Sequence, residues 1–101
     1  MTGEGVYVLE VFGSAMEPRY FAGEVVYVDP HQTASNGDFV VAQIQYQGEG
    51  LPRTHIKRLV SFDDQWLTLD QFNPRQSLTF PSSLVVLIHP IILAGKKPRL
   101  A

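Results

Sequence analysis

The sequence predicts a mainly β domain built of short, mostly antiparallel strands with little helix. Short β-rich runs recur along the chain, glycine, proline and asparagine turns separate them, and no convincing amphipathic helix interrupts them. The length of 101 residues suits one domain, so we expect a single unit over residues 1–101.

Three strands are expected in the first half of the chain. Residues 6–12 alternate two rows of β-forming side chains and give the first strand. Val25–Val28 gives the second, and Phe39–Ile44 gives the third after a strong turn signal. The segment Gly13–Pro18 predicts a turn or a short helical turn, because a residue before proline avoids helical geometry.

Three further strands are expected in the second half, which makes six in all. His55–Val60 is predicted to pair with the preceding strand as a hairpin. Trp66–Asp70 is the fifth strand, and Asn73–Pro74 marks a loop after it. Leu84–Leu93 is the last apolar segment, in which Pro90 argues for an edge position, a bulge or a strand break.

The composition narrows the classes of function. A net charge of −2 offers no basic excess for phosphate binding, so nucleic acid is a poor first guess for this segment alone. The absence of cysteine excludes disulfides and thiolate nucleophiles. His31, His55 and His89 lie too far apart for a spaced ligand motif, so we expect no metal and no cofactor. Asp63 and Asp64 are interpreted as turn residues rather than as a catalytic pair.

Neither a membrane span nor an export signal is visible. The longest apolar runs are far shorter than the roughly 20 residues that cross a bilayer. The first residues lack the basic, apolar and small-residue order of a secretory signal. We therefore expect a cytoplasmic protein without a membrane partner.

Lys57 stands out because it lies within an apolar strand pattern. Alternation puts Lys57 and Leu59 on one face of the strand, and Ile56, Arg58 and Val60 on the other. A lysine without water around it has a lowered pKa and can act as a general base near neutral pH. The alternative is a lysine at a sheet edge whose amine reaches solvent. The residues alone leave both interpretations open.

Four ordered segments resemble a known family. They read VFGSAMEP at residues 11–18, GEVVYVD at 23–29, NGDFVVA at 36–42 and IKRL at 56–59. This set resembles the LexA-like serine peptidase family, which includes LexA, UmuD and the carboxy-terminal domains of phage repressors. The resemblance covers about residues 8–62, and it implies the family's β fold and self-cleaving Ser-Lys chemistry.

The resemblance assigns two catalytic positions. The family's first motif is usually Gly-Asp-Ser-Met followed by Glu or a similar residue and Pro, and its serine is the nucleophile. Aligned on Gly13, Met16 and Pro18, the serine position is Ala15, and the general base matches Lys57. Alanine has no hydroxyl, so no acyl-enzyme can form there. Two accounts fit: a substitution made to trap an uncleaved form, or a natural member that has lost cleavage.

The same resemblance implies partners. Members of the family associate with themselves, so we expect a homodimer or a higher assembly. Leu84–Leu93 is the candidate edge strand at the contact, and an ordinary core strand is the alternative for the same segment. Operator DNA would be bound only through an amino-terminal domain, which we expect to be missing here together with the cleavage segment. A RecA-type filament is a further expected partner.

Three alternatives to a repressor domain stay open. The first is an UmuD-like protein that serves a translesion polymerase. The second is a signal-peptidase relative, which also pairs a serine motif with a lysine base. The third is a plain β interaction module in which Lys57 is structural. Upstream sequence would separate them, since each implies a different segment there.

Overall fold

The computed structural model describes residues 5–97, and these form seven β-strands and one short 3₁₀ turn. The strands are β1 (Tyr7–Glu10), β2 (Glu24–Val28), β3 (Phe39–Ile44), β4 (Arg53–Phe62), β5 (Trp66–Phe72), β6 (Arg75–Pro81) and β7 (Val85–Lys96), with the 3₁₀ turn η1 at Ser82–Leu84. All strand pairs are antiparallel. The prediction of a mainly β, mostly antiparallel fold is therefore confirmed.

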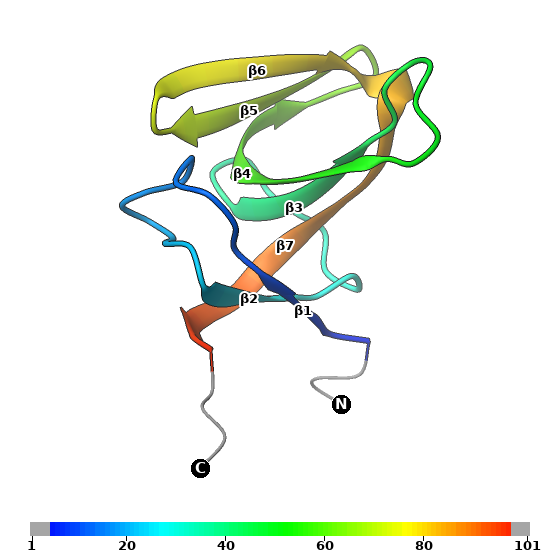
Figure 1. Ribbon diagram of the computed structural model, residues 1–101. Helices are drawn as coiled ribbons and strands as arrows, with labels where there is room; N and C mark the ends of the chain where they lie inside the picture. The colour runs from blue at the N-terminus through cyan, green and yellow to red at the C-terminus, as the bar shows by residue number, and fades with distance from the viewer. Residues whose placement is uncertain (1–4, 98–101) are drawn as a thin grey trace.

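The strands follow the order β1-β2-β7-β3-β4-β5-β6, and β7 connects two parts of the sheet (Figure 1). The first half of β7 pairs with β3, from Val85 opposite Ile44 to Pro90 opposite Val40. The second half pairs with β2. The β1–β2 pair is thus joined to the β3–β6 meander through one long strand.

Of the alternatives that Pro90 raises for Leu84–Leu93, a strand break is wrong, because residues 85–93 continue as one strand after η1 ends at Leu84. Residues 85–90 pair with β3 and residues 91–96 with β2, so each half of β7 has one ladder within the described chain, as an edge position implies. Proline has no N–H for a ladder, but Pro90 stands where the strand changes partner, and its carbonyl accepts a bond from the Asp29 N–H at 3.1 Å. The register with β2 shifts between Tyr27 and Val28, next to this point, so an irregularity of the bulge kind is present there as well.

β6 is a strand that the sequence does not predict. It pairs with β5 along its length, from Arg75 opposite Phe72 to Pro81 opposite Trp66. Only Leu78 is a partly buried aliphatic residue in this strand, and the polar residues around it are mostly exposed. An edge strand with one thin apolar face gives too weak an alternation to be recognised beside a proline turn.

The predicted hairpin of the third and fourth strands is confirmed. β3 and β4 pair from Phe39 opposite Arg58 to Ile44 opposite Arg53. β4 extends beyond the expected residues at both ends and lies between β3 and β5. It therefore occupies an interior position of the sheet.

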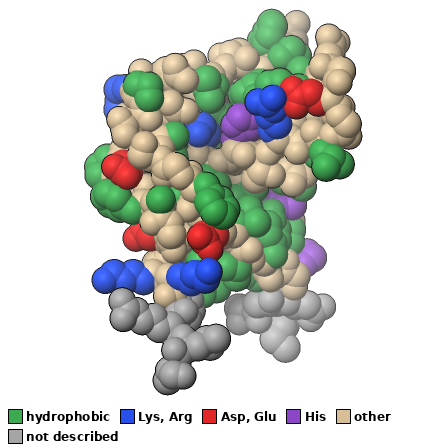
Figure 2. Space-filling model, in the orientation of Figure 1, with side chains coloured by type: hydrophobic (Ala, Val, Ile, Leu, Met, Phe, Trp, Pro, Cys, Tyr) green, Lys and Arg blue, Asp and Glu red, His purple; other side chains and the backbone are tan. Residues whose placement is uncertain are grey.

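Two clusters of buried side chains stabilise this arrangement. The first lies around β2 and the segment after β1: Val11, Met16, Tyr20, Val26, Val28 and Val41. The second lies between β3, β4 and β5: Val40, Ala42, Ile44, Leu59, Leu67 and Leu69. Apolar side chains cover much of the face in Figure 2, where the described charged groups of both signs are interspersed. The first cluster holds the turn at residues 13–20, and the second supports β4.

Candidate functional site

The turn after β1 carries the motif that the sequence analysis singled out. Gly13 begins it with φ +75°, a left-handed conformation that favours glycine. The Glu17 N–H donates to the Ser14 carbonyl at 3.1 Å, and the Tyr20 N–H donates to the Met16 carbonyl at 3.1 Å. The Met16 side chain is 3% exposed and packs in the first cluster. The predicted turn is therefore present and is anchored by one buried side chain.

Ala15 lies in this turn, which is fastened to a distant part of the chain. The Ala15 carbonyl accepts hydrogen bonds from the N–H groups of Phe72 at 3.1 Å and Asn73 at 2.8 Å. The Asn73 side-chain amide donates to the Ser14 carbonyl at 3.1 Å. The turn between β5 and β6 thus fixes the backbone on which residue 15 stands.

Lys57 lies on β4 and is 8% exposed, beside Leu59 at 2%. The two residues share the buried side of the strand, as alternation predicts, whereas Val60 is exposed. The ladder between β4 and β5 begins at Arg58, so Lys57 pairs with β3 alone, and its low exposure argues against an amine that extends into solvent. Burial lowers the pKa of the Lys57 amine, since the charged form loses hydration. Lys57 has the environment that a lysine general base needs.

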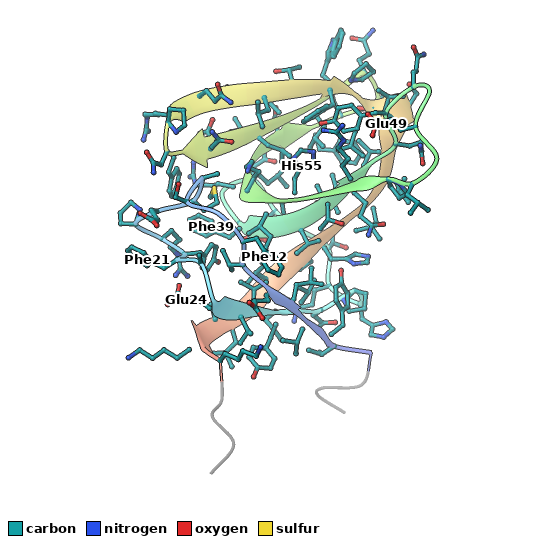
Figure 3. The ribbon with its side chains drawn as sticks, viewed as in Figure 1. Phe12, Phe21, Glu24, Phe39, Glu49 and His55 are labelled. Carbon is teal, nitrogen blue, oxygen red and sulfur yellow. The ribbon has the colours of Figure 1, made fainter. Side chains whose placement is uncertain are left out.

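Ala15 and Lys57 line one cleft of about 300 Å³. Its walls come from the end of β1, the turn after it and the first half of β4, and its lining residues are Leu9, Glu10, Val11, Phe12, Ala15, Met16, Thr54, His55, Ile56 and Lys57. Figure 3 labels Phe12 and His55 of this set. Gly13 and Pro18 are exposed motif residues outside the lining, so they shape the turn rather than the cleft.

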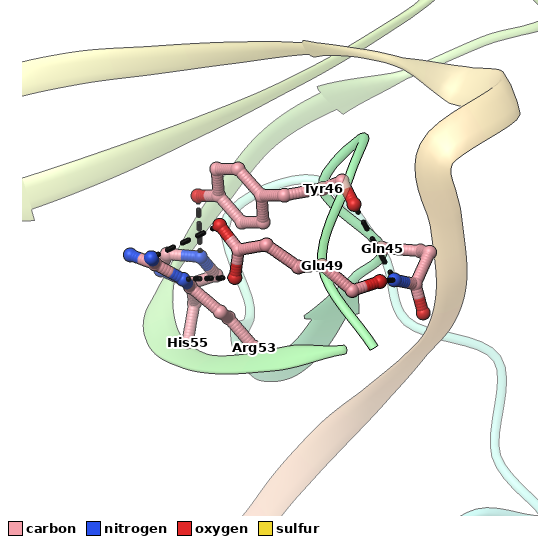
Figure 4. A network of polar contacts seen from close by, with 5 residues as sticks. All are labelled: Gln45, Tyr46, Glu49, Arg53 and His55. Atoms are coloured by element: carbon pink, nitrogen blue, oxygen red, sulfur yellow. Dashed lines mark hydrogen bonds and ion pairs between the residues drawn. The ribbon is translucent and has the colours of Figure 1, made fainter. Parts of the chain in front are cut away.

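His55 is a cleft residue that sequence reasoning did not assign to the site. Its Nε2 lies 3.0 Å from the Tyr46 hydroxyl, and its ring lies 5.5 Å from that of Phe80 (Figure 4 shows the Tyr46 contact). Arg53 stacks over Tyr46 at 4.9 Å and binds both carboxylate oxygens of Glu49. Burial, and then the positive charges of Lys57 and Arg53, lower the pKa of the His55 imidazole. The ring is thus held in place, with its neutral form favoured.

The remaining candidates of the sequence analysis fall elsewhere. His89 lies near Tyr7, with 2.8 Å between its Nδ1 and the Tyr7 hydroxyl, and His31 is exposed. Within residues 5–97 no group of three or more His, Asp or Glu side chains is arranged to hold a metal ion. Asp63 accepts bonds from the Gln65 and Trp66 N–H groups at 2.8 Å, as a turn residue does. The same described range contains no helix long and apolar enough to cross a membrane.

The cleft contains Lys57, the residue matched to a general base, but Ala15 stands where the resemblance places the nucleophile. A methyl group occupies position 15, and Ser14 is exposed and does not belong to the lining. The lining is otherwise mostly apolar, which suits an extended peptide more than a charged metabolite. Position 15 itself offers no atom that could attack a bound group.

Comparison with known proteins gives a consistent picture. A model of the family described as "Peptidase S24-like" matches residues 1–82. The chain is 40% identical over 93 residues to "Repressor protein C" of Rhizobium phage 16-3, covering 89% of this chain and 35% of that protein. It is 38% identical over 103 residues to "Prophage repressor CohE" of Escherichia coli (strain K12), covering 96% of this chain and 42% of that protein. The chain thus spans less than half of either relative. No solved structure matches.

Proposed function

The chain belongs to the Peptidase S24-like family, and from that membership we propose that it is the self-associating carboxy-terminal domain of a phage-type repressor. We propose further that its autocleavage is disabled at Ala15. One observation carries this proposal: the two positions that the family motif assigns, Ala15 and Lys57, line the same cleft although they stand far apart in the chain.

The proposed reaction of the serine form follows from Ser-Lys chemistry. The neutral Lys57 amine would accept the hydroxyl proton of a serine at position 15, and the oxygen would attack a peptide carbonyl carbon. The lysine would then return that proton to the leaving amine, and water would hydrolyse the acyl ester. The lowered pKa of Lys57 supports this role, because the base must be unprotonated before it acts.

Restoring the hydroxyl tests the proposal. We expect Ala15→Ser to cleave a peptide containing an Ala-Gly bond, with a rate that rises from neutral to alkaline pH as Lys57 loses its proton. Mass spectrometry of the products measures this directly. Lys57→Ala in the same background should abolish cleavage, whereas Lys96→Ala, at an exposed residue outside the cleft, should not. A folded Ala15→Ser variant without cleavage, both with the peptide in trans and with it fused upstream, would contradict the proposal.

Self-association is the second part of the proposed function. The exposed apolar side chains Val86 and Leu93 support a contact through β7, since each half of that strand pairs with one neighbour in the described part of the chain. Sedimentation velocity over a range of concentrations should show a dimer or larger species, which Leu93→Asp weakens. A monomer at every concentration would argue against this part.

DNA contact is proposed for a separate amino-terminal domain rather than for this one. Three described cations are already paired, Arg53 with Glu49, Arg58 with Asp70 and Lys97 with Glu10. The net charge of −2 offers no basic surface either. A RecA-type filament stays a proposed partner of the cleavage reaction.

A further inference from the structure

The Lys57 amine has no counterion in the part of the chain that the structure describes. No hydrogen bond or ion pair within residues 5–97 reaches its Nζ, although the residue is 8% exposed. A cation removed from water without a partner is unfavourable. In a serine form the hydroxyl at position 15 would offer such a partner, but Ala15 offers only a methyl group. The Lys57 Nζ is not among the fully buried polar atoms, so a ligand that enters the cleft can reach it.

We propose that this cleft binds the free carboxylate at the carboxy terminus of a peptide, with the Lys57 ammonium as its counterion. The proposal rests on the proposed function only in that a peptide chain enters the cleft, and it requires no reaction there. A cleaved peptide would end at the position where the scissile carbonyl carbon would lie. The site would thus recognise the kind of chain end that active relatives of this fold would generate.

The walls of the cleft favour a peptide over a simple anion. Val11, Met16 and Ile56 supply apolar surface beside the lysine, and Phe12 extends this surface outward at 81% exposed. A volume of about 300 Å³ lies at the small end of ligand pockets, enough for the last residues of a chain. Apolar side chains before the carboxylate would cover these walls, whereas an inorganic anion would leave them in water.

His55 offers a second contact to the carboxylate. It stands two residues before Lys57 on the same side of β4 and lines the same cleft. When its Nε2 accepts the proton of the Tyr46 hydroxyl, its Nδ1 carries a hydrogen that a carboxylate oxygen can accept. The neutral imidazole adds this donor without adding a second positive charge beside Lys57.

The other charged groups of the cleft do not compete for the ligand. Glu10 lines it from β1, but its carboxylate is 3.1 Å from the Lys97 amine. Arg53, at the start of β4, is held by Glu49 at 2.9 Å. The amine of Lys57 is therefore the cation left for an incoming carboxylate. Because the bound anion favours the charged amine, binding should take up a proton where the free amine is neutral.

Titration of the unaltered chain with two matched peptides tests the proposal. The probes are acetyl-Leu-Val-Ala with a free carboxylate and the same peptide as its carboxy-terminal amide. We expect the acid to bind at least about tenfold more tightly than the amide, which corresponds to one charge-assisted pair. NMR shifts should concentrate on β1, the turn at residues 13–20 and β4. Calorimetry in buffers of different ionisation enthalpy should reveal proton uptake, and affinity should fall as the pH rises.

Variants identify the group responsible. Lys57→Met keeps the length and apolar stem of the side chain, so we expect it to fold and to lose the preference for the acid. Lys96→Met removes one positive charge at an exposed position outside the cleft and should leave that preference unchanged. His55→Phe should reduce the affinity for the acid severalfold while retaining the preference.

Three outcomes would overturn the inference: equal binding of acid and amide, no binding of either, or an unchanged preference in Lys57→Met. The cleavage test with Ala15→Ser reports separately on the proposed function. Cleavage without a carboxylate preference would overturn this inference alone. A carboxylate preference without cleavage would contradict the proposed cleavage chemistry and leave the binding site standing.

Discussion

Lys57 and Ala15 line the same cleft, but different kinds of structure hold them there. Lys57 belongs to an interior strand and is packed beside Leu59 in the sheet. Ala15 stands on a turn outside the sheet, fastened by hydrogen bonds from Phe72 and Asn73 and by the buried side chain of Met16. The position of Lys57 therefore depends on side-chain packing, whereas that of Ala15 depends on backbone geometry. Substitutions near Lys57 should therefore act by changing side-chain packing, and substitutions in the turn should act by changing backbone conformation.

The largest effect is expected from packing under the lysine. Leu59→Ala should lower the free energy of unfolding by about 2–5 kcal/mol, because the truncated side chain leaves a cavity in the second cluster. Urea denaturation measures the loss. Val60→Ala, at the exposed neighbour on the same strand, should change stability by only about 0.5 kcal/mol. Similar losses for the two variants would show that β4 is not fixed by this packing.

Lys57 itself should lower the stability of the fold, so replacing it should be stabilising. Lys57→Met should raise the free energy of unfolding by about 1–3 kcal/mol at neutral pH, because burial disfavours the charged form of the amine that the substitution removes. The folded-state pKa of Lys57 lies below the reference value of 10.5, so the original chain gains stability as the pH rises from the folded pKa towards 10.5.

The advantage of the methionine variant should therefore narrow between neutral and alkaline pH. Denaturation curves at several pH values measure this change. An advantage that stays constant or widens with pH would mean that Lys57 finds a counterion in solution. Lys96→Met, at an exposed residue, provides the reference for a loss of charge alone.

A smaller effect is expected from backbone geometry on the side of the turn. Gly13→Ala should cost about 1–2 kcal/mol, since φ is +75° and no atom lies within 4 Å of an added Cβ. The cost then comes from the backbone conformation alone. Gly50→Ala, which also has open space but no left-handed φ, should be close to neutral. Thermal denaturation compares the two, and equal shifts would show that the turn does not require its glycine.

The smallest effect is expected from the hydrogen bond between the two turns. Asn73→Ala removes the 3.1 Å bond to the Ser14 carbonyl and leaves the backbone bond to Ala15, so we expect a loss of about 0.5–1.5 kcal/mol. Hydrogen exchange should become faster in residues 14–20 while β4 stays protected. Gln76→Ala on exposed β6 is the control. Faster exchange throughout β4 would mean that turn and strand open together.

Much of the fold follows from local pattern. Alternating β-forming runs and turn residues predict six of the seven strands, and the buried face of β4 that carries Lys57 follows from the same alternation. β6 is not predicted because its residues are mostly polar. The change of partner along β7 is not predicted either, since no local pattern shows that residues 85–90 pair with β3 and residues 91–96 with β2. Strand order is a long-range property that no single segment determines.

Part of the candidate site could also be predicted from the sequence, but from family resemblance rather than from local pattern. The correspondence of Ala15 and Lys57 to a catalytic pair comes from resemblance, because the contacts that fix Ala15 are made by its backbone and leave no side-chain pattern. The contact between Tyr46 and His55 depends on the loop that joins β3 to β4, whose conformation its polar residues do not specify. An aromatic residue and a histidine on either side of a hairpin loop are the available signal.

The path of β7 has a consequence for the order in which the molecule forms. β2 is made early by the ribosome, but its partner in β7 follows after most of the described chain. The hairpins of the β3–β6 meander can close as soon as each strand emerges, since their partners are neighbours in sequence. The β1–β2 pair can join the meander only after β7 has been made. The cleft between β1 and β4 is therefore completed only at the final stage of synthesis, when β7 joins the β1–β2 pair to the meander.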